Sequence, residues 1–252
     1  MKVERYQRLD SIRGITLLSM VLFHTVWDLV NIFRVDWDWF YTDLAFVWQQ
    51  SICWTFIALS GFCWSLGRRK WYRAFVIFGA GLVISFVTEF CAPDQRIRYG
   101  VLTLLGVSSF ILILLEKYLK NISAWGGFTF CCIAFIFSYG VNDGYLGLKK
   151  YLELELPRVL YQTGEFGNFL GFTESSFYSA DYFSLFPWIF LFLAGYFTYR
   201  IVEEGGGLVK LARQKSLGVF WDVLGRRSLI IYMLHQPVIY GVLLGLDKLR
   251  VI

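Results

Sequence analysis

Seven long apolar stretches divide the chain and constrain its fold more than any other feature. They lie near residues 12–33, 44–66, 74–91, 99–116, 124–140, 184–202 and 228–246. A helix needs roughly 20 mostly apolar residues to cross the hydrocarbon core of a bilayer, and each stretch comes close to that length. With 57% hydrophobic residues, the chain also holds more apolar side chains than a soluble domain uses. We therefore predict an all-α, polytopic membrane bundle of about seven transmembrane helices, formed by residues 1–252 as a single domain.

The basic residues predict the orientation of this bundle. If the seven helices alternate across the membrane, one side holds two thirds of the 24 Lys and Arg residues, and the other side is net acidic. The basic side consists of Lys2, Arg5, Arg8, Arg13, Arg68, Arg69, Lys70, Arg73, Lys117, Lys120, Arg200, Lys210, Arg213, Lys215, Arg226 and Arg227. The positive-inside rule makes this side cytoplasmic and places the N-terminus there. The net charge of +5 is then explained by topology and does not indicate a nucleic-acid partner.

Two connections between the stretches are longer than the others. The outer one, near 141–183, contains KKYLELELPRVLYQTGEFGNFLGF, for which we predict an interfacial helix before Pro157 and a Gly-rich loop after it. This connection is a candidate lid on the outer side. The inner one, 203–227, opens with the flexible run EEGGG and continues as a basic stretch, which we expect to be a solvated loop close to anionic lipid.

A stripe of polar residues runs along the first predicted helix. The eleven steps from Arg13 to His24 amount to about three full turns plus roughly 20°, so both residues share one face. They lie roughly 16 Å apart along the axis, which places Arg13 at the cytoplasmic boundary and His24 near the middle of the bilayer. Asp28 follows one turn after His24, and Asn31 lies one further turn outward. The stripe must face protein or water, because an ionisable residue at this depth is costly unless it is paired or hydrated.

The combination of His24 and Asp28 allows several roles. A carboxylate one turn away can orient an imidazole and stabilise its protonated form, which suits a general base. The same residues suit a hydrogen-bond clamp between helices, or a proton relay in a proton-coupled transporter or flippase. A non-catalytic membrane partner is a further alternative. A haem or metal role for His24 with His235 finds no other ligand cluster in the sequence, so we expect no metal.

Five segments of the chain resemble one known family. RLDSIRGITLLSMVLFHTVWDL resembles the opening of a bacterial membrane-protein family related to the catalytic domain of heparan-alpha-glucosaminide N-acetyltransferase. Four further segments resemble, in this order, the second, fourth, sixth and last helices of that family. They are FIALSGFCWSLGRR, IRYGVLTLLGVS, DYFSLFPWIFLFLAGYF and GRRSLIIYMLHQPVIYGVLL. The spacing from Arg13 over ten residues to His24 is also similar to the R-x10-H signature of the wider superfamily of membrane acyltransferases that acetylate envelope sugars.

The resemblance implies an acyltransferase in a bacterial-type cytoplasmic (plasma) membrane. The implied reaction moves an acyl group, acetyl in the simplest case, from cytoplasmic acyl-CoA (acetyl-CoA) to a hydroxyl or amine of a carbohydrate or amino-sugar acceptor. By the same resemblance, His24 would be the general base and Arg13 a donor-side residue, and the position of Asp28 one turn from His24 suits it to assist the base. A homo-oligomer in the lipid bilayer is compatible with this interpretation.

The remaining candidate site residues follow from this reaction. Guanidinium groups bind phosphate in a bidentate fork, so we expect the nucleotide of acyl-CoA to meet Arg13, Arg226 and Arg227 at the inner mouth. His235, before the potential kink at Pro237, would orient the acceptor or form a hydrogen bond across helices. Asp181 would bind the acceptor or cap the sixth helix.

Two further polar residues have expected places. Gln50 would hydrogen-bond the acceptor sugar or a neighbouring helix. Asp10 is expected to be the N-cap of the first helix.

Overall fold

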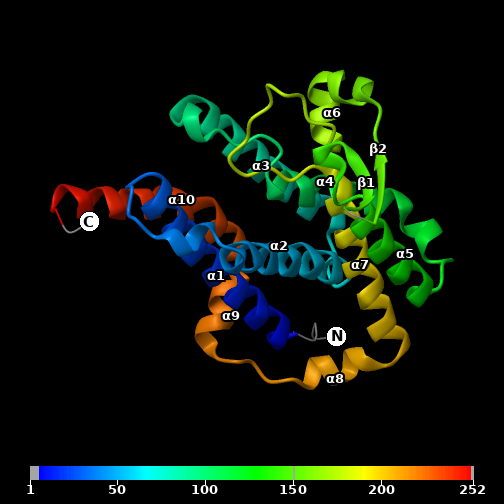
Figure 1. The fold of residues 1–252 in the computed structure, drawn as a ribbon. Helices are drawn as coiled ribbons and strands as arrows, with labels where there is room; N and C mark the ends of the chain where they lie inside the picture. The colour runs from blue at the N-terminus through cyan, green and yellow to red at the C-terminus, as the bar shows by residue number, and fades with distance from the viewer. Residues whose placement is uncertain (1–5, 150, 251–252) are drawn as a thin grey trace. The chain divides into compact units, whose positions relative to one another are not determined.

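The computed structural model describes residues 6–149 and 151–250, and it is helical over most of that length (Figure 1). The long helices are α1 (Gln7–Asn31), α2 (Asp43–Trp64), α3 (Lys70–Cys91), α4 (Val101–Leu119), α5 (Ala124–Phe137), α7 (Leu185–Glu204) and α10 (Ser228–Lys248). The short α-helices are α6 (Gly164–Leu170), α8 (Gly207–Arg213) and α9 (Val219–Arg226). The described residues also form four 3-10 turns, which are η1 (Asp38–Tyr41), η2 (Pro93–Gln95), η3 (Val141–Asp143) and η4 (Arg158–Gln162). The two strands are β1 (Tyr145–Leu148) and β2 (Leu152–Glu155). Lys2 and Arg5 of the predicted cytoplasmic side lie outside the described residues.

Each of the seven apolar stretches forms one of the long helices, which confirms the all-α membrane bundle. Within the described residues, six helices are long and apolar enough to cross a membrane. They are α1, α3, α4, α5 with the turn that follows it, α7 and α10. The remaining long helix, α2, has 22 residues but is not among the six.

The chain divides into two compact units. Unit 1 comprises Met1–Phe56 and Gly206–Ile252, and unit 2 comprises Ile57–Gly205, so α2 begins in one unit and ends in the other. In unit 1, α1 packs against α9 and α10. In unit 2, α3 packs against α4, and α7 packs against α5 and α4. The single domain expected from the sequence stays a prediction.

Small residues allow the helices of unit 2 to approach closely. A Cβ added at Gly61 on α2 would collide with the carbonyl oxygen of Phe192 on α7. A Cβ at Gly106 on α4 would lie 2.7 Å from the Cα of Phe78 on α3. Because lipid provides no hydrophobic drive between spanning helices, such close backbone packing is a main source of their association.

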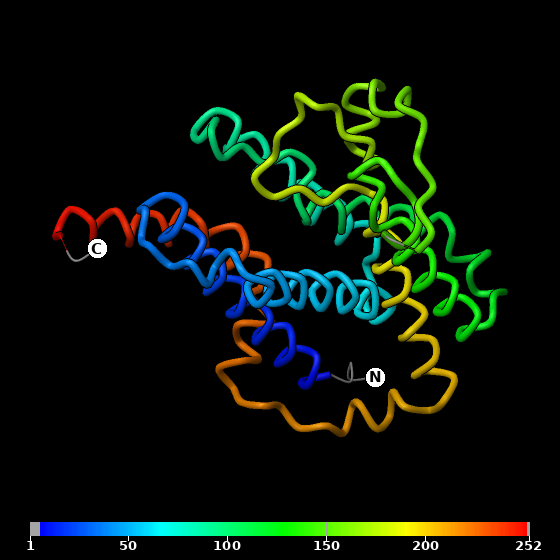
Figure 2. Tube along the Cα trace, viewed as in Figure 1, coloured from blue at the N-terminus to red at the C-terminus, as the bar shows by residue number. Residues whose placement is uncertain are grey.

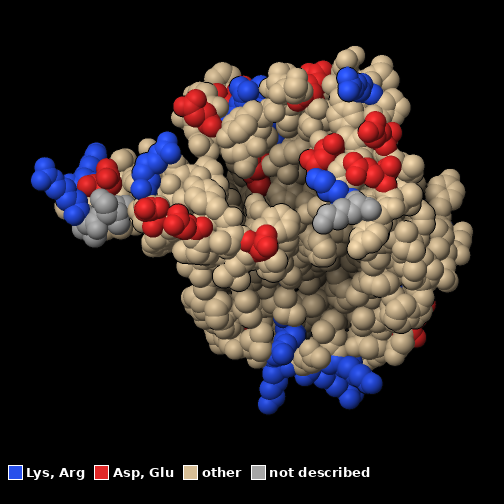
Figure 3. Space-filling view, viewed as in Figure 1, with Lys and Arg blue, Asp and Glu red and all other residues tan. Residues whose placement is uncertain are grey.

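The outer connection of unit 2 corrects the prediction of an interfacial helix. Before Pro157 the chain forms an antiparallel hairpin in which Tyr145 pairs with Glu155 and Leu148 with Leu152. All four residues of β2 are exposed, and their Leu-Glu-Leu-Glu alternation has the period of two that suits a strand rather than a helix. After Pro157 come η4 and the short helix α6, where we expected a Gly-rich loop. Acidic side chains gather over β1, β2 and α6 (Figure 3).

The inner connection of unit 1 is also more ordered than predicted. Instead of a solvated loop it forms α8 and α9, and α9 packs along α1. Basic side chains project around α8 (Figure 3). Asp10 is not the N-cap of α1, because the helix begins at Gln7 and Asp10 lies in its first turn. Its carboxylate instead lies 3.4 Å from Nη1 of Arg13, one turn further along the helix.

Contacts inside unit 2 agree with helices that alternate in direction. Arg200, at the end of α7, donates from Nη1 to the carbonyl oxygens of Leu119 (2.9 Å) and Ile122 (2.8 Å), which lie where α4 ends and α5 is about to begin. At the opposite ends of the helices, the amide of Phe183 donates to the carbonyl oxygen of Tyr99 at 2.9 Å. Figure 2 traces the backbone of these helices and of the segments that link them. The assignment of the basic side to the cytoplasm stays a prediction.

Candidate active site

Helices α1 and α10 bring the two histidines of the chain together in unit 1. The ring centroids of His24 and His235 lie 4.9 Å apart with an interplanar angle of 59°. Both side chains are half-buried, and the ring of Phe23 packs edge-on against His24 with a centroid distance of 6.1 Å. Two imidazoles at this distance are close enough to act on the same bound molecule.

His235 is oriented by the backbone of its own helix. Its Nδ1 lies 2.5 Å from the carbonyl oxygen of Tyr232. Because a carbonyl oxygen only accepts hydrogen bonds, Nδ1 must carry the hydrogen, and in a neutral ring Nε2 is then the basic nitrogen. A hydrogen bond of His235 across helices and a role in orienting the acceptor both stay predictions. Pro237 is accommodated inside α10, which runs as one helix from Ser228 to Lys248.

Asp28 is bonded to α10 rather than to His24. Its side chain is 0% exposed, and Oδ1 accepts a hydrogen bond from Nε2 of Gln236 at 2.8 Å. Asp28 Oδ2 and Gln236 Oε1 are also buried, and neither has a hydrogen-bond partner among the described residues. The sequence reasoning did not identify Gln236. The sequence held one signal for Gln236, because this polar residue follows His235 directly in a helix rich in apolar residues.

The three arginines expected to bind phosphate flank the crossing of α1 and α9. A Cβ at Gly14 would collide with the carbonyl oxygen of Trp221, and a Cβ at Gly225 would collide with that of Asp10, so the two backbones touch at these glycines. Arg13 precedes one glycine, and Arg226 and Arg227 follow the other. Arg226 and Arg227 are exposed, and Nε of Arg226 donates to the carbonyl oxygen of Asp222 at 3.1 Å. The crossing therefore gathers cationic groups, two of them exposed, at the start of the helix that carries His24.

A buried hydroxyl ties this crossing together. Ser11 Oγ is 0% exposed and lies 2.5 Å from Asp222 Oδ1, to which it donates. It also accepts a hydrogen bond from the amide of Leu217 at 3.0 Å. The contacts join the first turns of α1 to the segment that leads into α9, so Ser11 helps to place α9 against α1.

The other two predicted acceptor residues lie on α2 and on the outer connection before α7. Gln50 Oε1 accepts a hydrogen bond at 3.0 Å from Nε1 of Trp54, one turn along the same helix. Asp181 belongs to unit 2, and its alternative role as a helix cap is wrong because the N-cap position of α7 is Ser184. Roles of Gln50 and Asp181 in acceptor binding stay predictions.

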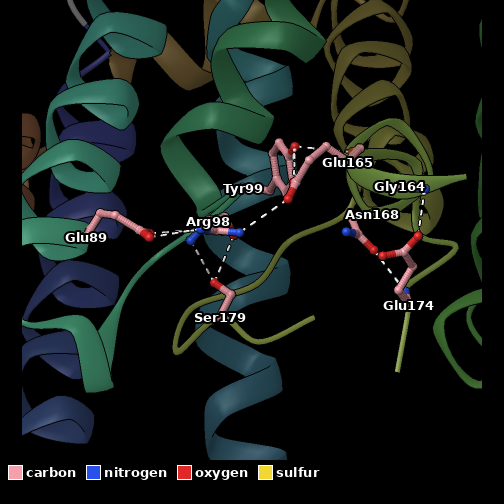
Figure 4. Close-up of polar contacts among 8 residues, drawn as sticks. All are labelled: Glu89, Arg98, Tyr99, Gly164, Glu165, Asn168, Glu174 and Ser179. Carbon is pink, nitrogen blue, oxygen red and sulfur yellow. Dashed lines mark hydrogen bonds and ion pairs between the residues drawn. The ribbon is translucent and has the colours of Figure 1, made fainter. Parts of the chain in front are cut away.

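Unit 2 carries a separate polar cluster on its outer connections (Figure 4). Arg98 joins Glu89 at the end of α3 (2.9 Å) to Glu165 on α6 (3.2 Å). The hydroxyl of Tyr99 donates to Glu165 Oε2 at 2.8 Å. Burial, together with this hydrogen bond, raises the pKa of Tyr99 to about 12, so the hydroxyl keeps its proton at neutral pH. Because its charges are paired with one another, we interpret the cluster as a brace between the connections and not as a reaction centre.

Further hydrogen bonds order the long outer connection next to this cluster. The carboxylate of Glu174 accepts from the amide of Gly164 at 2.9 Å, and the amide of Glu174 donates to Asn168 Oδ1 at 2.9 Å (Figure 4). The hydroxyl of Ser179 lies 2.9 Å from both the amide and the carbonyl oxygen of Arg98. The bonds of Glu174 lie within the long outer connection, and those of Ser179 hold it against the short connection between α3 and α4.

The groups gathered in unit 1 suit proton transfer. Within the described residues, no group of three or more His, Cys, Asp or Glu side chains could hold a metal ion. Two imidazoles, one of them oriented by a carbonyl, and a buried carboxylate one turn away are the parts that general acid–base chemistry requires. The site lies on helices that are long and apolar enough to span a membrane.

Comparison with known proteins identifies a family. No curated protein and no solved structure matches the chain. The family model described as heparan-alpha-glucosaminide N-acetyltransferase, catalytic, matches residues 5–237, which include all helices from α1 to α9 and the first part of α10. Because the match covers nearly the whole chain, this protein belongs to the family of the heparan-alpha-glucosaminide N-acetyltransferase catalytic domain.

Proposed function

We propose that this membrane acetyltransferase moves an acetyl group from cytoplasmic acetyl-CoA to a hydroxyl or amine of a carbohydrate-like acceptor. One observation carries the proposal. The ring centroids of His24 and His235 lie 4.9 Å apart, on two helices long and apolar enough to span a membrane. Family membership supports acetyl transfer, and the position of Arg13 on the same helix as His24 supports a donor that enters from the basic end.

The arginines at the crossing of α1 and α9 fit the phosphates of the donor. Arg226 and Arg227 are exposed, and Arg13 is 23% exposed beside Asp10, so all three can reach an anion in solvent. A guanidinium group holds phosphate oxygens by two parallel hydrogen bonds, which fixes orientation as well as affinity. A pantetheine arm held here would extend along α1, where His24 lies about 16 Å further on.

At the histidine pair, His24 acts as the general base. A neutral imidazole accepts the proton of the acceptor hydroxyl or amine while the acceptor atom bonds to the thioester carbon. The carbon–sulfur bond then breaks, and the imidazolium returns its proton to the departing thiolate, so the products are the acetylated acceptor and CoA thiol. The buried carboxylate of Asp28, one turn away on α1, stabilises the transient imidazolium.

The first test compares wild type with His24→Ala in detergent. Acetyl-CoA binding is measured by calorimetry, and thiol release is followed with a panel of amino sugars and sugar alcohols. We expect both proteins to bind acetyl-CoA and His24→Ala to release thiol about 10²- to 10⁴-fold more slowly, the usual contribution of a general base. The matched control is Thr25→Val on the same helix, because the Thr25 hydroxyl bonds to the carbonyl oxygen of Val21 in its own helix.

The opposite results have distinct meanings. Equal thiol release by wild type and His24→Ala would remove His24 from the chemical step. Folded protein that neither binds acetyl-CoA nor releases thiol would contradict the proposed reaction and favour a proton relay in a transporter.

A further inference from the structure

The buried polar atoms between α1 and α10 are not all satisfied within the protein. Asp28 Oδ2 and Gln236 Oε1 are buried without a hydrogen-bond partner among the described residues, although Asp28 Oδ1 and Gln236 Nε2 bond to each other at 2.8 Å. Buried polar atoms are nearly always hydrogen-bonded, so two unpaired oxygens on one bonded pair call for an explanation. Both atoms accept hydrogen bonds and neither donates, so the missing partner must carry hydrogen-bond donors.

The position of this pair relates it to the histidines. Gln236 is the next residue after His235, and Asp28 lies one helical turn from His24, about 6 Å along the axis of α1. A molecule whose reacting group lies at the imidazoles can therefore place other groups against the two oxygens.

We propose that Asp28 and Gln236 form an acceptor-orienting subsite, in which Asp28 Oδ2 and Gln236 Oε1 receive hydrogen bonds from hydroxyl groups of the acceptor other than the group that reacts. The inference rests on the proposed acetyl transfer and adds the class of group that the acceptor must carry beside its reacting atom. Carboxylate and amide oxygens are strong acceptors for hydroxyl groups, and the low dielectric between membrane helices strengthens such bonds. Gln236 thereby becomes a positioning residue with two functions, since its amide nitrogen holds Asp28 and its oxygen faces the acceptor.

A graded series of acceptors tests the subsite in the wild-type protein. Glucosamine, trans-2-aminocyclohexanol and cyclohexylamine present the same primary amine with several, one and no further hydroxyl groups. We expect the KM for transfer from acetyl-CoA to rise along this series by about 10- to 100-fold overall, as for the loss of hydrogen bonds to a charged group. Equal KM values for all three amines, or no transfer to any of them while acetyl-CoA still turns over, would overturn the subsite.

A matched pair of substitutions assigns the effect to Gln236. Gln236→Met keeps the length of the side chain and removes the amide, and Gln49→Met makes the same change at an exposed position on α2. We expect Gln236→Met to raise the KM for glucosamine relative to that for cyclohexylamine, and Gln49→Met to leave the ratio of the two KM values as in wild type. An unchanged ratio in Gln236→Met would exclude Gln236 from acceptor binding.

A spectroscopic measurement separates the subsite from the reaction itself. Infrared difference spectra are recorded with and without glucosamine for wild type and Asp28→Asn. A change in carboxyl absorption that Asp28→Asn lacks would support the subsite, even if acetyl-CoA fails to react and the proposed function falls. If acetyl-CoA reacts but no such change accompanies glucosamine, the reaction stands and the subsite is overturned. The latter result is expected if only a bound water satisfies the two oxygens.

Discussion

At the scale of single residues, the side chain of Ser11 joins α1 to the segment that leads into α9. Its fully buried hydroxyl donates to Asp222 and accepts from the amide of Leu217, so one atom completes two hydrogen bonds between distant parts of the chain. An alanine at this position would remove both bonds and leave Asp222 Oδ1 and the amide of Leu217 without this partner. Removing one partner of a hydrogen bond in this way costs about 1–3 kcal/mol of folding free energy. This exceeds the net contribution of a typical hydrogen bond to stability.

We therefore expect Ser11→Ala to lower the free energy of unfolding by about 1–3 kcal/mol. The measurement is the thermal unfolding midpoint of the detergent-purified protein. Ser51→Ala is the control, because the exposed hydroxyl of Ser51 donates to the carbonyl oxygen of Trp48 within the same helix. Identical midpoints for Ser11→Ala and wild type would show that these bonds do not hold α9 in place.

The second residue-scale prediction concerns the tautomer of His235. Its contact with the carbonyl oxygen of Tyr232 requires a hydrogen on Nδ1, so the neutral ring should be the Nδ1–H form. The chain contains two histidines, so nitrogen NMR of protein labelled with ¹⁵N-histidine gives signals simple enough to assign with His24→Gln. A neutral His235 ring protonated at Nε2 would contradict this geometry.

At the scale of elements, the crossing of α1 and α9 depends on two glycines. Gly14 and Gly225 each lie where a Cβ would meet the carbonyl oxygen of the opposite helix. This contact lets α9 pack along α1. It places Arg13 of α1 close to α9, and Arg226 of α9 close to α1. The inner connection therefore packs against α1, because Gly225 lies where the backbone of α1 comes closest.

We expect Gly14→Ala to lower the free energy of unfolding by about 1–3 kcal/mol, as for other overpacked contacts, and to weaken acetyl-CoA binding because the arginines move apart. Gly241→Ala on α10 is the control, since a Cβ there would meet nothing within 4 Å. In that control, removal of a helical glycine should stabilise the protein slightly, by up to about 1 kcal/mol. Thermal unfolding and calorimetry measure the two effects, and a Gly14→Ala protein as stable as wild type would refute the close crossing.

At the scale of the whole molecule, the distribution of charge predicts which side faces the cytoplasm. Basic residues surround α8, and acidic residues gather on the outer hairpin and α6. Translocation of short loops disfavours Lys and Arg, so the connection with α8 should stay inside and the hairpin should lie outside.

Labelling of intact cells with a membrane-impermeant maleimide tests this orientation. We expect Tyr151→Cys, whose native side chain is 88% exposed between β1 and β2, to be labelled from outside. Lys215→Cys, at an exposed position of the inner connection, should react after the membrane is permeabilised. Both changes are made with Cys91→Ser, because Cys91 is itself exposed. The reverse pattern of labelling would invert the topology.

Local patterns explain most of what could be predicted about this fold. Length and hydropathy are properties of one segment, so all seven long helices were predicted at nearly their observed positions. The outer hairpin was missed although its Leu-Glu-Leu-Glu alternation is a strand signal, because mixed apolar and charged residues before Pro157 also suit an interfacial helix. The fixed geometry of a helix likewise allowed the sequence to place Arg13, His24 and Asp28 on one stripe.

By itself, then, the sequence determined the membrane class, the spanning helices, the family and the polar stripe, since each depends on composition and spacing along one segment. Tertiary structure alone decided which groups the stripe meets. Asp28 and Gln236 are bonded across 208 residues of chain, and the partner of Asp28 proved to be this glutamine rather than His24. The approach of His235 to His24 and the close crossing at Gly14 are decided in the same way. Contacts between distant segments depend on how helices pack against one another. The periodicity of a single helix shows which face is polar, but not which helix lies against that face.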